Sequence, residues 1–381
     1  MQKVKVLHII KSLGRGGAEM LLPQTLKIHN QERFEFHYLY FLPWKDQMVQ
    51  EIMSFGGKVT CFSASNNIQL LQQSRNVIGY CKENKIDVIH CHLPWSGFLG
   101  RMIHKKSGIP LIYTEHNIQE RYHIATKVLN KLSFNFQNMA IGVSKDVTRS
   151  IKENINPKIP VKTVLNGVNT EFFKRDLKKG DSIREKFNIP TEAIVVGNIA
   201  VFREQKALPV WLKAFKKIIS EFPNVYGILV GAGPLEGEIK SLIVELELSS
   251  NLILPGLQTD TVSYFSAMDI FMMSSDFEGL PIALLEAMSM ECAVVSTKAG
   301  GVTEVIREKK DGLLCETGES DCLAKHVSYL IDNDGIRKEF QKSARERVKN
   351  AFSLKTMVNE LEDCYLELSG GVKSERVKSK E

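Results

Sequence analysis

Residues 275–287, which read SDFEGLPIALLEA, hold the side chains best suited to chemistry. Two glutamates, Glu278 and Glu286, flank seven residues that include Pro281. Proline suits the first turn of a helix because the N–H that it lacks would be unpaired there, and Gly279 permits a turn just before it. We therefore expect Glu278 on a loop at the start of a helix and Glu286 about one and a half turns inside that helix.

This arrangement would place two carboxylates on either side of free helix amides. The amides of Gly279, Leu280 and Ile282 lack helical partners, and together with the helix dipole they favour a phosphate. Carboxylates accept hydrogen bonds from pairs of sugar hydroxyls. The combination predicts a nucleotide-sugar site, with ribose at one end, hexose at the other and pyrophosphate between them. Two isolated glutamates on a helix would more often be solvated surface, but the Ser-x-x-Glu-Gly-Leu-Pro context favours a site.

A second candidate is the glycine-rich segment 11–19, KSLGRGGAE, which follows an apolar run. Glycines such as Gly16 and Gly17 at a strand-to-helix turn let the backbone approach a ligand and aim helix amides at an anion. The pattern is not the full dinucleotide fingerprint, and a tight turn alone would also explain it. The next strand ends at residues 41–44, FLPW, without the acidic residue that would hold a ribose. This absence counts against a nicotinamide-dependent dehydrogenase.

Short β-branched apolar runs alternate with segments of helical period along the whole chain, and this alternation predicts the fold that positions the two candidate sites. Such alternation indicates βαβ units with a parallel sheet and helices on both faces. Thirteen strand candidates are too many for one twisted open sheet. We therefore predict an α/β protein of two facing Rossmann-like, doubly wound domains. Parallel sheets bind ligands at the carboxyl ends of their strands, so an inter-domain cleft would hold two substrates.

The domain bounds follow from changes in composition. The polar, weakly patterned segment 169–190 is interpreted as a linker, so that the first domain spans 1–170 and the second 171–353. The helix expected at 354–368 would pack back onto the first domain. Residues 369–381 are polar and without periodicity, and we expect a disordered tail there.

Composition excludes several classes of protein. Of the 381 residues, 43% are hydrophobic and 25% are charged, which is ordinary for a soluble globular chain and excludes disordered, collagen-like and small disulfide-scaffold classes. The chain has no run of 18 apolar residues, and its N-terminal apolar stretch is interpreted as a strand rather than a signal peptide. These features predict a cytoplasmic protein.

The seven cysteines show no paired short spacing, so we interpret them as small buried residues in a reducing compartment. The tripeptide His90-Cys91-His92 has no second cluster to complete a tetrahedral site. We therefore predict no metal and no cofactor.

Charge is distributed unevenly. Residues 1–150 carry 19 Lys and Arg against 10 Asp and Glu, a net +9, whereas residues 151–381 carry 31 against 34, a net −3. A basic first half suits an anionic partner, either a membrane surface or a phosphorylated acceptor, although a solvated lysine-rich surface explains it equally well. The sequence contains no nucleic-acid-binding motif, and we expect no nucleic-acid partner.

Together with the paired glutamates, several stretches in the same order resemble the retaining glycosyltransferases of family 4. The resemblance covers about residues 4–352 and is most specific in the second half. The further stretches are Ala140–Ser144, Leu165–Thr170, Val196–Asn198, Phe202–Lys206, Leu229–Pro234, Ala293–Thr297, Gly300–Glu304 and Asp311–Leu314. The resemblance implies the GT-B fold, with an acceptor-side first domain and a second domain that binds a nucleotide-sugar donor.

The resemblance also implies roles for donor-side residues. Glu286 would hold the donor ribose and Glu278 would contact the donor sugar. A cationic pair, Arg203 and Lys206, would neutralise charge on the pyrophosphate. Many members place the arginine five residues before the lysine, where this chain has Val201, and the spacing of three found here also occurs in the family.

Four more residues match the family pattern. Gly16 and Gly17 correspond to the N-terminal loop that approaches the donor phosphate or the acceptor. His116, in the stretch YTEHN, corresponds to a histidine of the cleft near the reacting carbon. Glu304, after the Gly300-Gly301 pair, is a further donor-side candidate.

The implied reaction moves a sugar from a nucleoside diphosphate to a hydroxyl of a saccharide or of a lipid-pyrophosphate-linked saccharide, with retention of the anomeric configuration. The family needs no divalent metal, and the chain has no Asp-x-Asp. Its proposed route is same-face attack, so His116 would position substrate or contact backbone rather than act as a general base. UDP is the family's commonest donor nucleotide and GDP the next. A nucleotide-sugar 2-epimerase on the same fold and a non-catalytic nucleotide-sugar-binding protein remain as alternatives.

Overall fold

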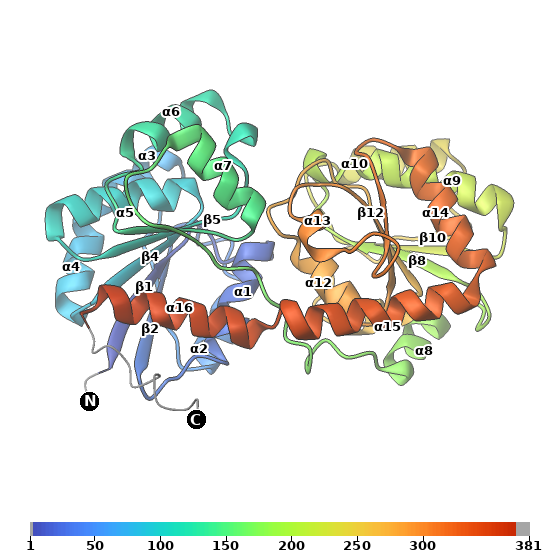
Figure 1. Cartoon of the computed structure of the whole chain (residues 1–381), viewed down its shortest axis with the longest axis horizontal. Helices are drawn as coiled ribbons and strands as arrows, with labels where there is room; N and C mark the ends of the chain where they lie inside the picture. The colour runs from blue at the N-terminus through green and yellow to red at the C-terminus, as the bar shows by residue number, and fades with distance from the viewer. Residues whose placement is uncertain (1–2, 371–381) are drawn as a thin grey trace. The chain divides into compact units, whose positions relative to one another are not determined.

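The structure is a computed structural model that describes residues 3–370, and it contains two compact units (Figure 1). Unit 1 holds the described residues up to Asn166 and those from Leu354 onward, and unit 2 comprises Gly167–Ser353. The predicted tail at 369–381 lies outside the described residues from 371 on. Within the described part of the chain, no helix combines the length and apolarity that crossing a bilayer requires.

Unit 1 is built on a seven-stranded parallel sheet with the order β3-β2-β1-β4-β5-β6-β7. Its strands are β1 (Val4–Ile9), β2 (Phe34–Tyr40), β3 (Lys58–Cys61), β4 (Val88–His92), β5 (Leu111–Glu115), β6 (Met139–Gly142) and β7 (Val161–Thr163). The helices between them are α1 (Gly17–Leu26), α2 (Val49–Ser54), α3 (Asn67–Gln72), α4 (Ser74–Asn84), α5 (Pro94–Ser107), the 3-10 turn η1 (Gln119–Arg121), α6 (Ile124–Ser133) and α7 (Lys145–Ile155). The last helix of the chain, α16 (Leu354–Leu368), packs on β1 and α1.

Unit 2 repeats the plan with a six-stranded parallel sheet in the order β10-β9-β8-β11-β12-β13. Its strands are β8 (Val195–Ile199), β9 (Tyr226–Val230), β10 (Leu252–Ile253), β11 (Ile270–Met273), β12 (Ala293–Thr297) and β13 (Leu313–Cys315). Its helices are α8 (Leu177–Lys186), the 3-10 turn η2 (Glu204–Lys206), α9 (Leu208–Glu221), α10 (Glu236–Glu245), α11 (Thr261–Ala267), α12 (Ile282–Ser289), α13 (Val302–Val305), α14 (Ser320–Asp332) and α15 (Asp334–Ala351).

The strand order of each sheet fixes where a ligand can bind. In unit 1 the order reverses between β1 and β4, and in unit 2 it reverses between β8 and β11. At such a switch point the loops leaving the two neighbouring strands diverge and open a crevice at the carboxyl ends. The two Rossmann-like sheets confirm the predicted fold class, and the seven and six strands of residues 3–370 match the predicted number of thirteen.

The segment 169–190, interpreted from its sequence as a linker, contains helix α8 and belongs to unit 2. Helix α8 packs on α11, and a Cβ added at Gly180 would come within 2.6 Å of the Ser266 carbonyl oxygen. Ile183 is buried on the same helix. Because Gly180 and Ile183 are the only buried residues of α8 and its other residues are mostly charged, the helical period of apolar residues is weak in the sequence.

The cysteines also differ from expectation. Cys315, at the end of β13, and Cys322, in α14, form a disulfide across the turn that joins these elements. Four of the other cysteines are buried, as predicted for small apolar residues, and Cys61 is half-buried. The separation of seven residues did not indicate a disulfide in the sequence, because the turn from strand to helix, rather than a short motif, brings the two thiols together.

Candidate functional site

In unit 2, the loop after β8 is held in place by a glycine turn after β9. Gly231 has a φ of +138°, and a Cβ there would lie 1.9 Å from the carbonyl oxygen of Ala200, so only glycine fits. The amide of Phe202 donates to Ala232 O at 3.0 Å, and the amide of Leu235 donates to Phe202 O at 3.1 Å. These contacts fix the backbone immediately before residues 203–206.

Lys206 and Glu278 form an ion pair at the β8–β11 switch point. The distance between Lys206 Nζ and Glu278 Oε1 is 2.5 Å, and the glutamate is almost fully buried. Gln205 donates through Nε2 to Phe277 O at 2.9 Å and to Glu278 Oε2 at 3.2 Å. The hydroxyl of Ser274, just after β11, lies 2.9 Å from Lys206 O. The structure thus brings together Lys206 and Glu278, for which the resemblance implies contacts with the pyrophosphate and with the donor sugar.

Arg203 is not brought into this pair. It precedes η2 with an exposed side chain. Over residues 3–370, no hydrogen bond or ion pair of its guanidinium is present. Lys206 is therefore the cation that meets the carboxylate in this structure, and the role of Arg203 stays a prediction.

Glu286 lies inside α12 and is buried. The helix begins at Ile282, so Pro281 precedes the first helical residue instead of lying in the first turn as predicted. Among the described residues, Glu286 Oε1 has no hydrogen-bond partner, and the same is true of the buried Ser275 hydroxyl that follows β11. Burial raises the pKa of Glu286 to about 8. A buried carboxyl oxygen without a hydrogen-bond partner is costly in a folded protein, which is a strong reason to expect a ligand there.

The remaining donor-side candidates lie at the same edge of the sheet. Gly279 and Leu280 are buried in the loop between Glu278 and α12. The amide of Gly301 approaches Glu278 O at 3.4 Å, which ties the loop after β12 to this segment. Glu304 is half-buried in the short helix α13, and its carbonyl oxygen accepts a hydrogen bond from Arg347 at 2.9 Å.

In unit 1, the glycine loop connects β1 to α1 as predicted. Gly16 is the residue before α1 and Gly17 is its exposed first residue. The hydroxyl of Ser12 donates to Glu19 Oε1 at 3.1 Å, and a Cβ at Gly16 would meet the flexible end of the Glu19 side chain. The loop therefore presents backbone at the carboxyl end of β1.

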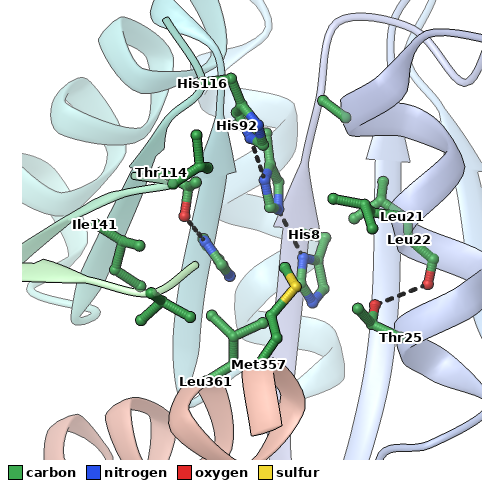
Figure 2. A pocket seen from close by; sticks show the side chains of 14 residues that line it. His8, Leu21, Leu22, Thr25, His92, Thr114, His116, Ile141, Met357 and Leu361 are labelled. Atoms are coloured by element: carbon green, nitrogen blue, oxygen red, sulfur yellow. Dashed lines mark hydrogen bonds between the residues drawn. The ribbon is translucent and has the colours of Figure 1, made fainter. Parts of the chain in front are cut away.

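Three imidazoles form a hydrogen-bonded chain at the β1–β4 switch point. His8 Nδ1 lies 2.9 Å from His92 Nε2, and His92 Nδ1 lies 3.3 Å from His116 Nε2 (Figure 2). Burial lowers the pKa of all three, that of His116 to about 4. The rings are therefore neutral near pH 7, and His116 is a poor general base but a suitable hydrogen-bonding group. The sequence singled out His116 without its two supporting rings.

His90 lies beside this chain but has its own partners. Its Nδ1 is 2.8 Å from the Tyr365 hydroxyl and its Nε2 is 2.6 Å from Thr114 Oγ1. Nitrogens of His8, His90 and His92 lie within 4.8 Å of one another, a grouping that could hold a metal ion. Because hydrogen bonds engage both nitrogens of His90, we keep the prediction that no metal binds here. The sequence reasoning did not include His8, which the β1–β4 register places opposite His90.

The backbone beside His92 is strained. Leu93 has φ 68° and ψ 157°, a region that is essentially restricted to glycine. Its neighbour Pro94 begins α5. Strain of this kind persists where surrounding contacts over-determine the conformation, and it clusters at functional sites.

A buried carboxyl locks the loop that carries His116. Glu115 accepts hydrogen bonds from the hydroxyls of Tyr113 (2.8 Å) and Tyr122, and from Gln119 Nε2 at 2.6 Å. It also accepts the backbone amide of His116 at 3.0 Å. Glu115 lies in the YTEHN stretch beside His116, but its network depends on side chains that converge only in the fold.

A pocket lies under these histidines (Figure 2). Its apolar walls come from α1, β6 and α16, and its polar groups come from the ends of β1, β4 and β5. The lining residues are His8, Ala18, Leu21, Leu22, Thr25, His90, His92, Thr114, His116, Ile141, Val143, Val164, Met357 and Leu361.

Comparison with known proteins agrees with this geometry. The model of the glycosyl transferases group 1 matches residues 180–347, and that of glycosyltransferase family 4 matches residues 30–172. The chain is 23% identical over 386 residues to the UDP-Gal:alpha-D-GlcNAc-diphosphoundecaprenol alpha-1,3-galactosyltransferase of Escherichia coli, covering 96% of this chain and 97% of that protein. It is also 23% identical to the capsular polysaccharide biosynthesis glycosyltransferase CapM of Staphylococcus aureus, with the same coverage.

Solved structures show the same fold. Anabaena HepE in complex with UDP-glucose has a TM-score of 0.86 at 21% identity, over 95% of this chain and 99% of that one. The fold and the paired-glutamate segment define a GT-B glycosyltransferase. The chain belongs to glycosyltransferase family 4, in the glycosyl transferases group 1.

Proposed function

We propose that this glycosyltransferase transfers a sugar from a UDP-sugar to a hydroxyl of a saccharide or lipid-linked saccharide during the synthesis of a cell-surface polysaccharide. The observation that carries the proposal is Glu286, a buried carboxyl with an unpartnered oxygen at the family's ribose position. Ribose hydroxyls would supply the missing hydrogen bonds. UDP is favoured over GDP because one relative is named for UDP-galactose and one structural neighbour was solved with UDP-glucose.

The ion pair of unit 2 supports the electrostatic part of this proposal. As the bond between the anomeric carbon and the diphosphate breaks, negative charge grows on the leaving UDP. Lys206 lies close to the N-terminus of the segment that leads into α12, and its charge together with the amides of that segment would stabilise the diphosphate. Glu278, now paired with Lys206, would accept hydrogen bonds from the donor sugar.

We further propose that transfer retains the anomeric configuration and needs no divalent metal. The acceptor oxygen would form its bond on the face from which the diphosphate departs, and a diphosphate oxygen would take the acceptor proton. A neutral His116 fits this route, since it can donate or accept a hydrogen bond to position the sugar without removing the proton. Arg203, Gly16, Gly17 and Glu304 are proposed as further donor contacts.

For the acceptor, two relatives named for diphosphoundecaprenol-linked substrates favour a lipid-pyrophosphate-linked saccharide. Such a substrate is held at a membrane, and the net charge of +9 over residues 1–150 suits an anionic surface. We therefore propose peripheral attachment of unit 1 to the cytoplasmic face of a membrane.

A donor screen followed by a transfer assay tests the proposal. UDP-, GDP- and ADP-sugars are compared for the rise in Tm that each produces, because a ligand that binds the folded state stabilises it by mass action. The preferred donor is then incubated with lipid-linked acceptors, and with no acceptor. Acceptor-dependent release of UDP supports a transferase. Isomerisation of the donor sugar without acceptor would indicate the 2-epimerase, and binding without turnover would indicate a binding protein.

A further inference from the structure

Helix α6 presents its apolar side to solvent and its polar side to the protein. Ile124 and Leu132 are 74% and 73% exposed, and Val128 and Leu129 between them are also exposed. The only fully buried residue of the helix is polar, Asn130. A surface helix of a globular protein normally has the opposite arrangement, with its apolar stripe facing the core.

Polar contacts under the helix fix this orientation. Arg101 is buried in α5 and donates from Nη1 to Asn130 Oδ1 and to the Ser133 hydroxyl, both at 2.9 Å. Asn130 Nδ2 donates to Gln119 Oε1 at 3.1 Å. The guanidinium of Arg101 also lies over the ring of Phe134, just after α6. Rotating the helix to bury its apolar side would break all of these bonds, so the exposed apolar face is built into the fold.

Positive charge borders the apolar face. Lys127 and Lys131 lie on α6 itself, and the helix contains no acidic residue. Lys105, at the end of the neighbouring α5, lies 5.3 Å from the ring centroid of the exposed Phe136. An apolar face with a cationic border matches the structure of a bilayer surface, where acyl chains lie below anionic headgroups.

We propose that α6 is the part of unit 1 that lies in the interface of an anionic lipid bilayer. Ile124, Val128 and Leu132 recur at every fourth position, so they form one stripe that would enter the acyl boundary while the lysines meet headgroups. This inference rests on the proposed function, in which unit 1 works at a membrane, and it names the surface that makes the contact. Helix α6 lies in unit 1 next to α5 and α7 (Figure 1).

Vesicle flotation of the full chain tests the proposal. The triple variant Ile124→Ser, Val128→Ser, Leu132→Ser is compared with wild type on vesicles of phosphatidylcholine with phosphatidylglycerol. Loss of three apolar side chains that would enter the acyl boundary predicts a fall in partitioning of more than about 100-fold. The matched control is Leu177→Ser, which removes a leucine of similar exposure (68%) from α8 in unit 2 and should float as wild type does. Because the substituted side chains are exposed, all variants should keep the Tm of wild type.

A charge variant separates electrostatic from apolar binding. Lys127→Glu with Lys131→Glu should weaken binding to the anionic vesicles by on the order of tenfold or more and leave binding to pure phosphatidylcholine unchanged. Wild type that does not float, or a triple variant that floats equally well, would overturn the proposal. Concentration-dependent dimers of wild type that the triple variant lacks, without flotation, would show that a second copy covers this face and would also overturn it. Transfer to a water-soluble acceptor analogue tests the activity separately, since the side chains of Ile124, Val128 and Leu132 are exposed and the polar contacts under α6 stay intact in the triple variant.

Discussion

Glu286 makes a quantitative prediction because its carboxyl is buried without a full set of partners. Its pKa in the folded protein is about 8, against 4.5 for an ordinary glutamate, so the folded state keeps a proton that the unfolded state releases between these values. The unfolded chain therefore binds fewer protons, and the stability of wild type falls as pH rises from about 4.5 to about 8. At pH 7 the loss is on the order of 3 kcal/mol, from about 1.4 kcal/mol for each pH unit above the ordinary pKa.

Glu286→Gln removes this loss, because the amide has the shape of the protonated acid and does not titrate. We expect its Tm at pH 7 to exceed that of wild type by on the order of 5–10 °C, and the difference to vanish near pH 4.5. Thermal unfolding followed by circular dichroism across this pH range measures the effect. Glu278→Gln is the matched control, since that carboxylate is already paired with Lys206 and its loss should lower Tm or leave it unchanged.

The same variant should weaken nucleotide binding. If ribose hydroxyls bind the ionised form of Glu286, UDP binding releases its proton, and UDP affinity of wild type should rise about tenfold between pH 7 and pH 9. Glu286→Gln should bind UDP more weakly and without this rise. Titration calorimetry at the two pH values measures both. If Glu286→Gln is less stable than wild type at pH 7, or binds UDP with unchanged affinity and pH dependence, then Glu286 is neither a destabilising buried acid nor the ribose contact.

Three further predictions concern the parts that support the site. Lys206→Met should reduce kcat/KM by about 100- to 1000-fold in the UDP-release assay. The control Lys240→Met breaks an exposed ion pair on α10 and should leave kcat/KM unchanged in the same assay. His8→Phe should change the tautomer ratio of neutral His116, measured by nitrogen-15 NMR, because it removes one ring of the imidazole chain. His90→Phe lies outside this chain and should leave the ratio unchanged. An unchanged His116 spectrum in both variants would show that the chain has no influence on His116. Gly231→Ala should lower the free energy of unfolding by about 3 kcal/mol or more, because its Cβ would meet the carbonyl oxygen of Ala200. The control Gly237→Ala lies in α10, where a Cβ meets nothing, and should raise the free energy of unfolding by about 0.5–1 kcal/mol. Equal unfolding midpoints of the two variants in denaturant would contradict the role given to the Gly231 turn.

The sequence predicted the sheets well because strands of a parallel sheet are buried on both faces. Runs such as 139–143 and 293–296 are apolar and β-branched and stand out between polar helices. Helix α8 was missed because its burial depends on Gly180 and Ile183 alone. The disulfide between Cys315 and Cys322 was missed for a related reason, since the tertiary turn creates the contact.

The site was predictable where its residues are close in sequence. Glu278 and Glu286 share one loop and helix, so spacing alone placed them. The pairing of Glu278 with Lys206 joins residues far apart in sequence through the order of β8 and β11, and the resemblance rather than the spacing supplied Lys206. The His8–His92–His116 chain depends on strand register between β1, β4 and β5, which composition does not reveal.

A structure of the complex with an intact UDP-sugar would show whether the two glutamates hold the donor. We expect ribose hydroxyls within hydrogen-bond distance of Glu286 Oε1 and hydroxyls of the transferred sugar at Glu278, with Lys206 on the diphosphate. A complex in which the nucleotide binds elsewhere, or in which either glutamate has no contact with the donor, would contradict it.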